Sequence, residues 1–456
     1  MTDTLHEQLK VGVGPKPTRR TAIRSVGAAL ALTTLPAVIR PLGPAGLVSV
    51  TGKRFELDGA PYRYMGTNMW YGAYLGADTD YGDRNRLRRE LDRLRALGID
   101  NVRVMCGSEA SPLKGSVTPT FRDRSTRFNE QLLGGLDYLL VELRRRDMRA
   151  VMCINNFWEW SGGMQAYLYW ANGGHYVDEN DPAAPWPAYA DFTAQFYANI
   201  PAVAMADDYV RAIVGRTNSI TGKRYAEDPG IMAWQLANEP RPGETAAKGY
   251  LPAYAAWIKS TARLIKSIDP HHLVSTGAEG VIGCLRSEAC LTLATPPEID
   301  YMSIHIWPKN FGWINVTDLT GSRATGRAMT RSYIDQHIAL ATKLGRPLVL
   351  EEFRYPRDGG SYDPTATTTE RDAFYRFVMD AVTKDAKRGG PLTAVSFWAW
   401  NGEGRAQHSD YIFRAGDTNW LGDPSHEPQG YYGVFDTDRS TQSVIREYAT
   451  ALRRIG

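Results

Sequence analysis

The sequence predicts an α/β fold, a (β/α)8 barrel of the TIM type, from three observations. First, 456 residues with 43% hydrophobic side chains are enough for one large domain with a buried core. Second, eight short apolar runs alternate with longer helical stretches. Third, polar and charged residues gather where the apolar runs end, which is where barrel enzymes place their active sites. A doubly wound sheet is the weaker alternative.

The first strand is expected just after a short N-terminal hairpin. Residues 48–57 and 61–66 flank Asp58-Gly59, a dipeptide typical of a tight β-turn. Alternating apolar and helical patterns then predict the remaining elements. The later strands are expected at 102–106, 150–154, 231–237, 273–276, 301–306, 348–350 and 394–398, and helices at 84–97, 132–146, 254–268, 333–344, 371–387 and 441–454.

Two long segments, 157–187 and 401–433, lack regular periodicity but are rich in aromatic residues. Loops of this length in a compact domain are usually functional or disordered, and the aromatic content argues against disorder. We expect both segments to form long loops at the C-terminal face of the barrel, where they would wall a cleft.

The N-terminus has the pattern of an export signal. Residues 17–21, PTRRT, precede an alanine-rich apolar stretch at about 26–38, as in twin-arginine signals. We therefore expect residues 1–44 to be an export signal with a flexible segment, and residues 45–456 to be the catalytic domain. A disordered basic tail is the alternative. The apolar stretch is too short for a membrane span, so a secreted or periplasmic protein is predicted.

Charge and cysteine content exclude some partners. The net charge is only +3 and the basic residues are scattered, so we do not expect the protein to bind nucleic acid. Cys284 and Cys290 bracket a short loop and could form a disulfide after export. Cys106 and Cys153 end neighbouring strands and are more simply free thiols, although a bridge is possible. Neither pair has zinc-site spacing, so we expect no metal. We also expect that the protein needs no cofactor and is a monomer.

Two glutamates at strand ends are the candidate catalytic residues. The segment IMAWQLANEP ends in Asn238 and Glu239, and PLVLEEF ends in Glu351 and Glu352. Because side chains alternate along a strand, Glu352 is expected to face inward and Glu351 outward. Two carboxylates at a barrel mouth are what glycosidic bond cleavage requires, one as acid and one as nucleophile or base. We expect Glu239 to be the acid, Asn238 to bind the sugar 2-hydroxyl, and Glu352 to be the nucleophile.

Other polar and aromatic residues at strand ends are candidates for substrate binding. Arg103 is expected to keep Glu352 ionised by lowering its pKa, while the pKa of the acid Glu239 stays higher. Arg103 could equally be a structural arginine, and His305 or Trp398 a core residue. The remaining candidates are Asn155, Asn156, Trp158, Trp307 and Trp400.

Three segments resemble one known family. NNFWEWSGGMQAYLYW at 155–170, STGAEG at 275–280 and LVLEEF at 348–353 are similar to glycoside hydrolase family 5 of clan A, specifically its β-1,4-mannanase-like subfamily. The resemblance covers nearly the whole chain after about residue 45. It implies that Glu239 is the acid/base and Glu352 the nucleophile, and that Arg103, Asn238, His305 and Trp398 occupy other active-site positions of the family.

The chain departs from the family pattern at two positions. Trp307 stands where a tyrosine is common, two residues after the histidine, and Arg354 follows EEF where glycine is usual. Both positions bear on fine specificity rather than on the reaction class.

The resemblance implies a retaining, endo-acting hydrolase of β-1,4-linked mannans. An exo-acting β-mannosidase or mannobiohydrolase is the first alternative, since residues 426–436, HEPQGYYGVFD, resemble bacterial members that include exo-acting enzymes. A β-1,4-glucanase and a non-catalytic carbohydrate-binding barrel are further alternatives. The presence of both glutamates argues against a purely binding role.

Overall fold

The computed structural model describes residues 46–125, 127–245 and 247–455. The expected export signal lies outside the described residues, as does the expected boundary at residue 44. Within the described part of the chain, no helix is both long enough and apolar enough to cross a membrane.

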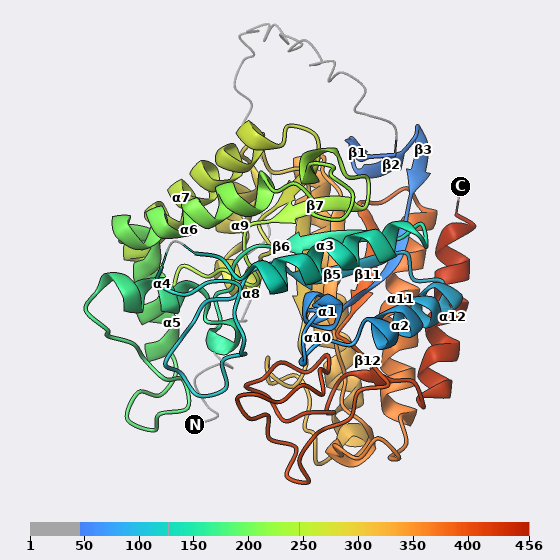
Figure 1. Cartoon of the computed structure of the whole chain (residues 1–456). Coiled ribbons are helices and arrows are strands. Elements are labelled where there is room, and N and C mark those ends of the chain that lie inside the picture. The colour runs from blue at the N-terminus through green and yellow to red at the C-terminus, as the bar shows by residue number, and fades with distance from the viewer. Residues whose placement is uncertain (1–45, 126, 246, 456) are drawn as a thin grey trace, which may run out of the picture. The chain divides into compact units, whose positions relative to one another are not determined.

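Eight parallel strands form the barrel, which confirms the predicted fold (Figure 1). The order of neighbours is β8-β7-β6-β5-β4-β11-β10-β9. Two backbone hydrogen bonds link the outer strands of this order, from Asp300 N to Val274 O at 2.8 Å and from His305 N to Glu279 O at 3.0 Å. The strands are β4 (Tyr64–Asn68), β5 (Asn101–Met105), β6 (Arg149–Cys153), β7 (Ile231–Gln235), β8 (Leu273–Ser275), β9 (Met302–Ile306), β10 (Leu348–Phe353) and β11 (Leu392–Phe397).

Helices surround the strands, as the alternating pattern predicted (Figure 1). Helix α2 illustrates why they form: the Asp83 side chain accepts a hydrogen bond from Arg86 N at its start, and Gly98 ends it with a φ of 91°. The longer helices are α2 (Arg84–Leu97), α3 (Glu130–Arg144), α6 (Ile200–Val214), α7 (Ala247–Ile268), α10 (Leu319–Leu344), α11 (Thr369–Lys387) and α12 (Arg439–Arg453). The shorter ones are α1 (Gly72–Gly76), α4 (Gly163–Ala171), α5 (Ala188–Thr193), α8 (Val281–Cys284) and α9 (Ser287–Ala294).

Six of these helices were missed by the sequence patterns: the five short ones and α6. Helix α4 lies in the segment predicted to be irregular, and seven of its nine residues are buried, so it lacks the one-sided periodicity that identifies a surface helix. Helix α6 did carry a signal, because Asn199 caps its start and Pro201 occupies its first turn. Its omission was an error of interpretation.

A three-stranded sheet closes the N-terminal end of the barrel. The expected strand at 48–57 is two strands, β1 (Val48–Thr51) and β2 (Arg54–Leu57), and β2 pairs with β3 (Ala60–Tyr62). The predicted turn at Asp58-Gly59 is confirmed, with φ of 50° and 81°. Phe55 lies in the barrel interior, with its ring 5.4 Å from that of Tyr301. The sheet therefore covers the end opposite the expected site.

A long loop crosses the other end. Residues 403–433, here called the β11–α12 loop, follow β12 (Trp400–Gly402) and precede β13 (Val434–Phe435). The Trp420 ring lies 4.6 Å from that of Tyr74, after β4. Ser425 Oγ donates to Trp160 O at 3.1 Å, after β6. This loop therefore packs against the loop after the neighbouring strand β4 and reaches the loop after β6, three strands away.

All four cysteines are buried and free. The expectation for Cys106 and Cys153 is confirmed, and Cys106 Sγ donates to Cys153 O at 3.2 Å. The possible disulfide between Cys284 and Cys290 is not formed. Burial raises the pKa of the Cys290 thiol well above its usual range, which disfavours the thiolate that disulfide formation requires.

Candidate active site

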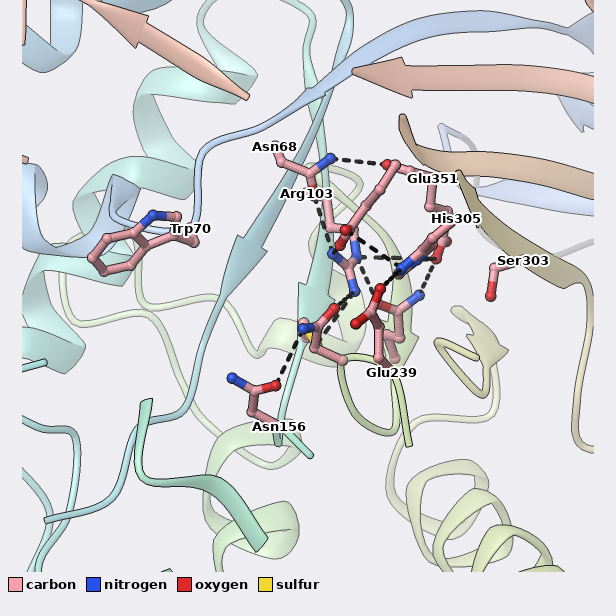
Figure 2. A network of polar contacts seen from close by, with 12 residues as sticks. Asn68, Trp70, Arg103, Asn156, Glu239, Ser303, His305 and Glu351 are labelled. Atoms are coloured by element: carbon pink, nitrogen blue, oxygen red, sulfur yellow. Dashed lines mark hydrogen bonds and ion pairs between the residues drawn. The ribbon is translucent and has the colours of Figure 1, made fainter. Parts of the chain in front are cut away.

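Arg103 is the centre of a polar network at the C-terminal ends of the barrel strands (Figure 2). Its Nη1 donates to Glu352 Oε1, and to Asn68 Oδ1 at 3.0 Å. Its Nη2 donates to Asn238 Oδ1 at 2.8 Å, and its Nε to Gln235 Oε1 at 2.7 Å. One buried guanidinium thus positions residues from three other strands or their ends.

Asn68 and Gln235 were not among the residues expected in the site. Each is the polar last residue of its strand, β4 or β7. Asn68 Nδ2 also donates to Glu351 O at 2.9 Å, and Gln235 Nε2 to Glu351 Oε2 at 2.7 Å. The same signal that identified Asn238 and Glu352, a polar residue where an apolar strand ends, could have found both.

The two candidate carboxylates and His305 meet in one group. His305 Nδ1 lies 2.6 Å from Glu239 Oε1 and 3.4 Å from Glu352 Oε2. Each of the three side chains offers an atom within 4.8 Å of the other two. Glu352 is 1% exposed and Glu239 is 6% exposed. Glu352 Oε2 accepts no hydrogen bond from the described residues.

Glu352 faces the site as predicted, whereas Glu351, which was expected to point away from it, also reaches the polar network. Leu350 packs in the layer between strands and helices, whereas Val349 lies inside the barrel, so simple alternation would turn Glu352 outward. The register between β10 and β9 shifts between Leu350 and Glu352, which makes Glu351 an extra residue. Because of this bulge, both glutamates reach the polar network. Glu351 Oε1 accepts a hydrogen bond from Tyr301 at 3.1 Å.

The pKa values of the two carboxylates are ordered opposite to expectation. Burial alone would raise the pKa of Glu239, but the hydrogen bond and charge of His305 outweigh it and lower that pKa to about 2. Burial raises the pKa of Glu352 to about 7, against the opposing charges of His305 and Arg103. Burial would lower the pKa of His305, but the charge of Glu352 and the bond to Glu239 raise it to about 10. The raised pKa of His305 favours its protonated form beside Glu239.

Three residues of the NNFW segment arrange the surroundings of Glu239. Trp158 Nε1 donates to Glu239 Oε2 at 2.6 Å. Asn156 Oδ1 accepts from Asn238 Nδ2 and from Trp158 N, both at 3.1 Å. Asn155 O accepts from Asn238 N at 2.8 Å. Glu239 itself has a φ of 49°, an uncommon conformation for a residue other than glycine, and these bonds help to hold it there.

Trp307 and Trp398 follow β9 and β11, the two strands that flank β10 with Glu352. Their ring centroids are 5.5 Å apart, and neither indole nitrogen has a hydrogen-bond partner among the described residues. The Arg354 guanidinium lies between the rings of Trp307, at 3.1 Å, and Tyr432, at 3.8 Å. Its Nη1 and Nη2 donate to Glu427 at 2.6 and 2.9 Å. The two departures from the family pattern, Trp307 and Arg354, are thus in direct contact.

Trp400 does not belong to this site, which corrects the prediction. The side chain is fully buried, and its Nε1 donates to Glu90 Oε2 on helix α2 at 2.9 Å. Its carbonyl accepts a hydrogen bond from Tyr71 OH at 2.7 Å. The chain turns at the end of β11, so the indole faces the helical layer and has a structural role.

A (β/α)8 barrel with two buried carboxylates at its strand ends is the architecture of a retaining glycoside hydrolase. Comparison with known proteins agrees: residues 45–456 match the family described as GH family 5 beta-mannosidase-like. The chain belongs to glycoside hydrolase family 5, in its β-mannosidase-like group.

Solved structures and curated proteins include clear relatives. The crystal structure of a glycoside hydrolase family 5 mannosidase from Rhizomucor miehei is 31% identical, with a TM-score of 0.82 over 90% of this chain and 98% of that one. The putative mannan endo-1,4-beta-mannosidase 9 of Oryza sativa subsp. japonica is 28% identical over 407 residues, or 87% of this chain and 86% of the relative. An endo-1,4-beta-mannanase from Rhizomucor miehei, at 23% identity and a TM-score of 0.64, shares the fold.

Proposed function

We propose that this protein hydrolyses β-1,4-mannosidic bonds in mannans and manno-oligosaccharides with retention of configuration. The observation that carries the proposal is the separation of the two carboxylates, whose nearest offered atoms lie within 4.8 Å. Retaining enzymes need about 5 to 5.5 Å between carboxyl groups, whereas inverting enzymes need about 6.5 to 9.5 Å to admit a water molecule. The names of the curated relatives support mannan as the substrate.

In this mechanism Glu352 attacks the anomeric carbon and the bond to the leaving oxygen breaks. Glu239 donates a proton to that oxygen, and the glycosyl group is then held on Glu352. Glu239 next removes a proton from water, which attacks the anomeric carbon and releases Glu352. The proton for the first step is close by, because protonated His305 lies 2.6 Å from Glu239 Oε1. Arg103 holds Glu352 in place for the attack.

Substitution of each glutamate tests these roles. Glu352→Ala should lower turnover by about 10⁴-fold or more, because no covalent intermediate can form. Glu239→Ala should lower it by about 10²- to 10⁴-fold, mostly for substrates with poor leaving groups, and added azide should restore part of the rate. Steady-state kinetics on aryl β-mannosides and mannohexaose measure both effects.

The control is Glu142→Gln, which changes a buried glutamate of helix α3 outside the site. Undiminished hydrolysis by pure, folded Glu352→Ala would overturn the nucleophile assignment. A Glu239→Ala variant without leaving-group dependence or azide rescue would make Glu239 structural.

Endo action is our first proposal for the mode of attack, because the curated relatives are named as endo-acting enzymes. Exo action is favoured by one observation: the β11–α12 loop reaches across to the loop after β6, where His426 Nδ1 lies 2.8 Å from Glu159 Oε1. Reduced mannohexaose distinguishes the two modes. Oligosaccharides of mixed length at early times indicate endo action, and mannose or mannobiose alone indicates trimming of chain ends.

A further inference from the structure

We propose that Trp158 and Trp186, joined by Arg241, form a binding surface for sugar units on the leaving-group side of the cleaved bond. The surface would bind the apolar faces of at least one unit beyond the sugar that contacts Glu239. This inference rests on the proposed function, and it adds a specificity-determining residue, Trp186, that was not among the expected site residues.

Contact with Glu239 defines the side of the bond on which this surface lies. Trp158 Nε1 donates to Glu239 Oε2 at 2.6 Å. In the proposed mechanism Glu239 protonates the leaving oxygen, so the group next to Glu239 borders the leaving sugar. Trp307 and Trp398 instead follow β9 and β11, the strands that flank β10 with Glu352, and Glu352 attacks the other sugar. Trp158 therefore begins a surface that leads away from the cleaved bond on the leaving side.

Trp186 extends this surface outward. Its ring is stacked with that of Trp158 at 6.1 Å between centroids and 27° between planes. Tyr189 is stacked with Trp158 at 5.7 Å and 7°, and its hydroxyl donates to Phe157 O at 2.8 Å. Trp158 therefore packs with one buried ring, Tyr189, and one half-exposed ring, Trp186. A run of nearly parallel rings suits the flat apolar faces of linked pyranoses.

The exposure of Trp186 is unusual for its residue type. It is 49% exposed, and among the described residues no other tryptophan reaches that degree of exposure. Leaving an indole half in water forgoes much of the stabilisation that its burial would supply. A sugar unit placed against this ring would remove that apolar surface from water.

Arg241 fixes the two rings relative to each other. Its guanidinium carbon lies 5.1 Å from the Trp158 centroid and 5.5 Å from the Trp186 centroid. Its Nε lies 2.6 Å from Glu279 Oε1 in the loop after β8, and its Nη1 donates to Glu244 at 3.2 Å. The arginine is buried and anchored on two sides, so it acts as a positioning residue for the surface.

Backbone contacts hold the segment that carries Trp186 against the same loop. Glu244 N donates to Asp191 Oδ1 at 2.7 Å, and Asp191 lies in helix α5, five residues after Trp186. The long segment after β6 that carries both rings is therefore tied to the loop after β7 through Arg241 and Asp191. A surface held in this way is ready for binding without rearrangement, which limits the entropy lost on association.

The test is the dependence of kcat/KM on substrate length for Trp186→Ala. For wild-type enzyme and variant, kcat/KM is measured on β-1,4-linked mannobiose, mannotriose, mannotetraose and mannohexaose. We expect the ratio of kcat/KM for mannohexaose to that for mannobiose to fall about two- to tenfold in the variant, through KM rather than kcat. Trp186→Phe should recover part of this loss.

The matched control is Tyr176→Ala. Tyr176 is 46% exposed on the same long loop, but its ring contacts Tyr169 rather than Trp158. Tyr176→Ala should leave the dependence of kcat/KM on substrate length as in the wild type. An equal loss for every substrate length in Trp186→Ala would show that Trp186 only supports the loop, and an unchanged ratio would show that it binds no sugar. Either result overturns the inference.

Failure of the proposed function would look different. If the wild-type enzyme cleaves no mannoside, the same series is run as binding isotherms of mannohexaose and cellohexaose to the Glu352→Ala enzyme. Weaker binding of either oligosaccharide in the Glu352→Ala/Trp186→Ala variant would support the binding surface while the mannan hypothesis falls. If the single and the double variant bind each oligosaccharide with the same affinity, the surface is overturned as well.

Discussion

The two sides of the catalytic centre use the same residue types in opposite ways. On the Glu239 side, Arg241 is anchored below a pair of tryptophans of which the outer one is half exposed. On the Glu352 side, Arg354 is 3% exposed, enclosed between Trp307 and Tyr432, and paired with Glu427 from the β11–α12 loop. One arginine supports an open surface, and the other fills the space that such a surface would need.

This difference indicates in which direction a bound sugar chain can extend. Exposed aromatic faces gain stabilisation only when a ligand covers them. A buried ion pair between two rings is already fully engaged and would lose much if it opened. We therefore expect the chain to extend past Glu239 and to meet a barrier at Arg354. Three predictions can break or sharpen this comparison.

The largest effect is expected for Arg354→Met. The substitution removes a buried guanidinium and leaves the partly buried Glu427 without its partner, and should lower the free energy of unfolding by about 3 kcal/mol. Denaturant unfolding measures this change. The double variant Arg354→Met/Glu427→Gln should recover most of the loss, since it leaves no unpaired charge. A loss below about 1 kcal/mol in the single variant would mean that the pair does not close this side.

A smaller effect, dependent on pH, is expected for His426→Asn. His426 Nδ1 lies 2.8 Å from Glu159 and 3.5 Å from Glu179, with Glu427 also facing it. Burial would lower its pKa, but the charge of Glu159 and the hydrogen bonds to both glutamates raise it well above the usual range. We expect the variant to lose about 1 to 3 kcal/mol of unfolding free energy.

The sign of the pH dependence follows from that raised pKa. A group whose pKa is higher in the folded state stabilises it fully below the unfolded pKa, near pH 6.5 for histidine, and loses this effect as pH rises through the folded value. The difference in unfolding free energy between wild type and His426→Asn should therefore be largest at acid pH and shrink at alkaline pH. Unfolding at a series of pH values measures it, and a difference that grows with pH would contradict the assignment.

The smallest effect is expected for Trp158→Phe. The substitution keeps the ring stack but removes the hydrogen-bond donor to Glu239 Oε2. The loss of this hydrogen bond should cost about 1 kcal/mol. Because a donor stabilises the carboxylate, its removal should raise the affinity of the coupled Glu239–His305 pair for the proton and move the alkaline limb of kcat/KM to higher pH. The pH profile of kcat/KM measures this shift. Movement of the limb to lower pH would exclude Trp158 as a partner of the acid.

The fold and much of the site were predictable because both depend on local signals. Apolar runs located all eight strands, and polar residues at their ends identified Arg103, Asn238, Glu239 and His305. The bulge in β10 was not predictable, since it depends on pairing with β9, and it brings Glu351 as well as Glu352 to the polar network. The order of the pKa values depends on a 2.6 Å contact between residues 66 positions apart, which no residue pattern reveals.

The N-terminal sheet limits how the chain can be processed. Phe55 and Val48 lie in the same apolar cluster as Tyr301, Val349 and Ala394, so the beginning of the domain and its last strands complete each other. A peptidase that cut after Val48 would leave those side chains exposed to water at the base of the barrel. Any maturation of the N-terminus must therefore stop before β1, and a shortened chain lacking β1 and β2 should be prone to aggregation.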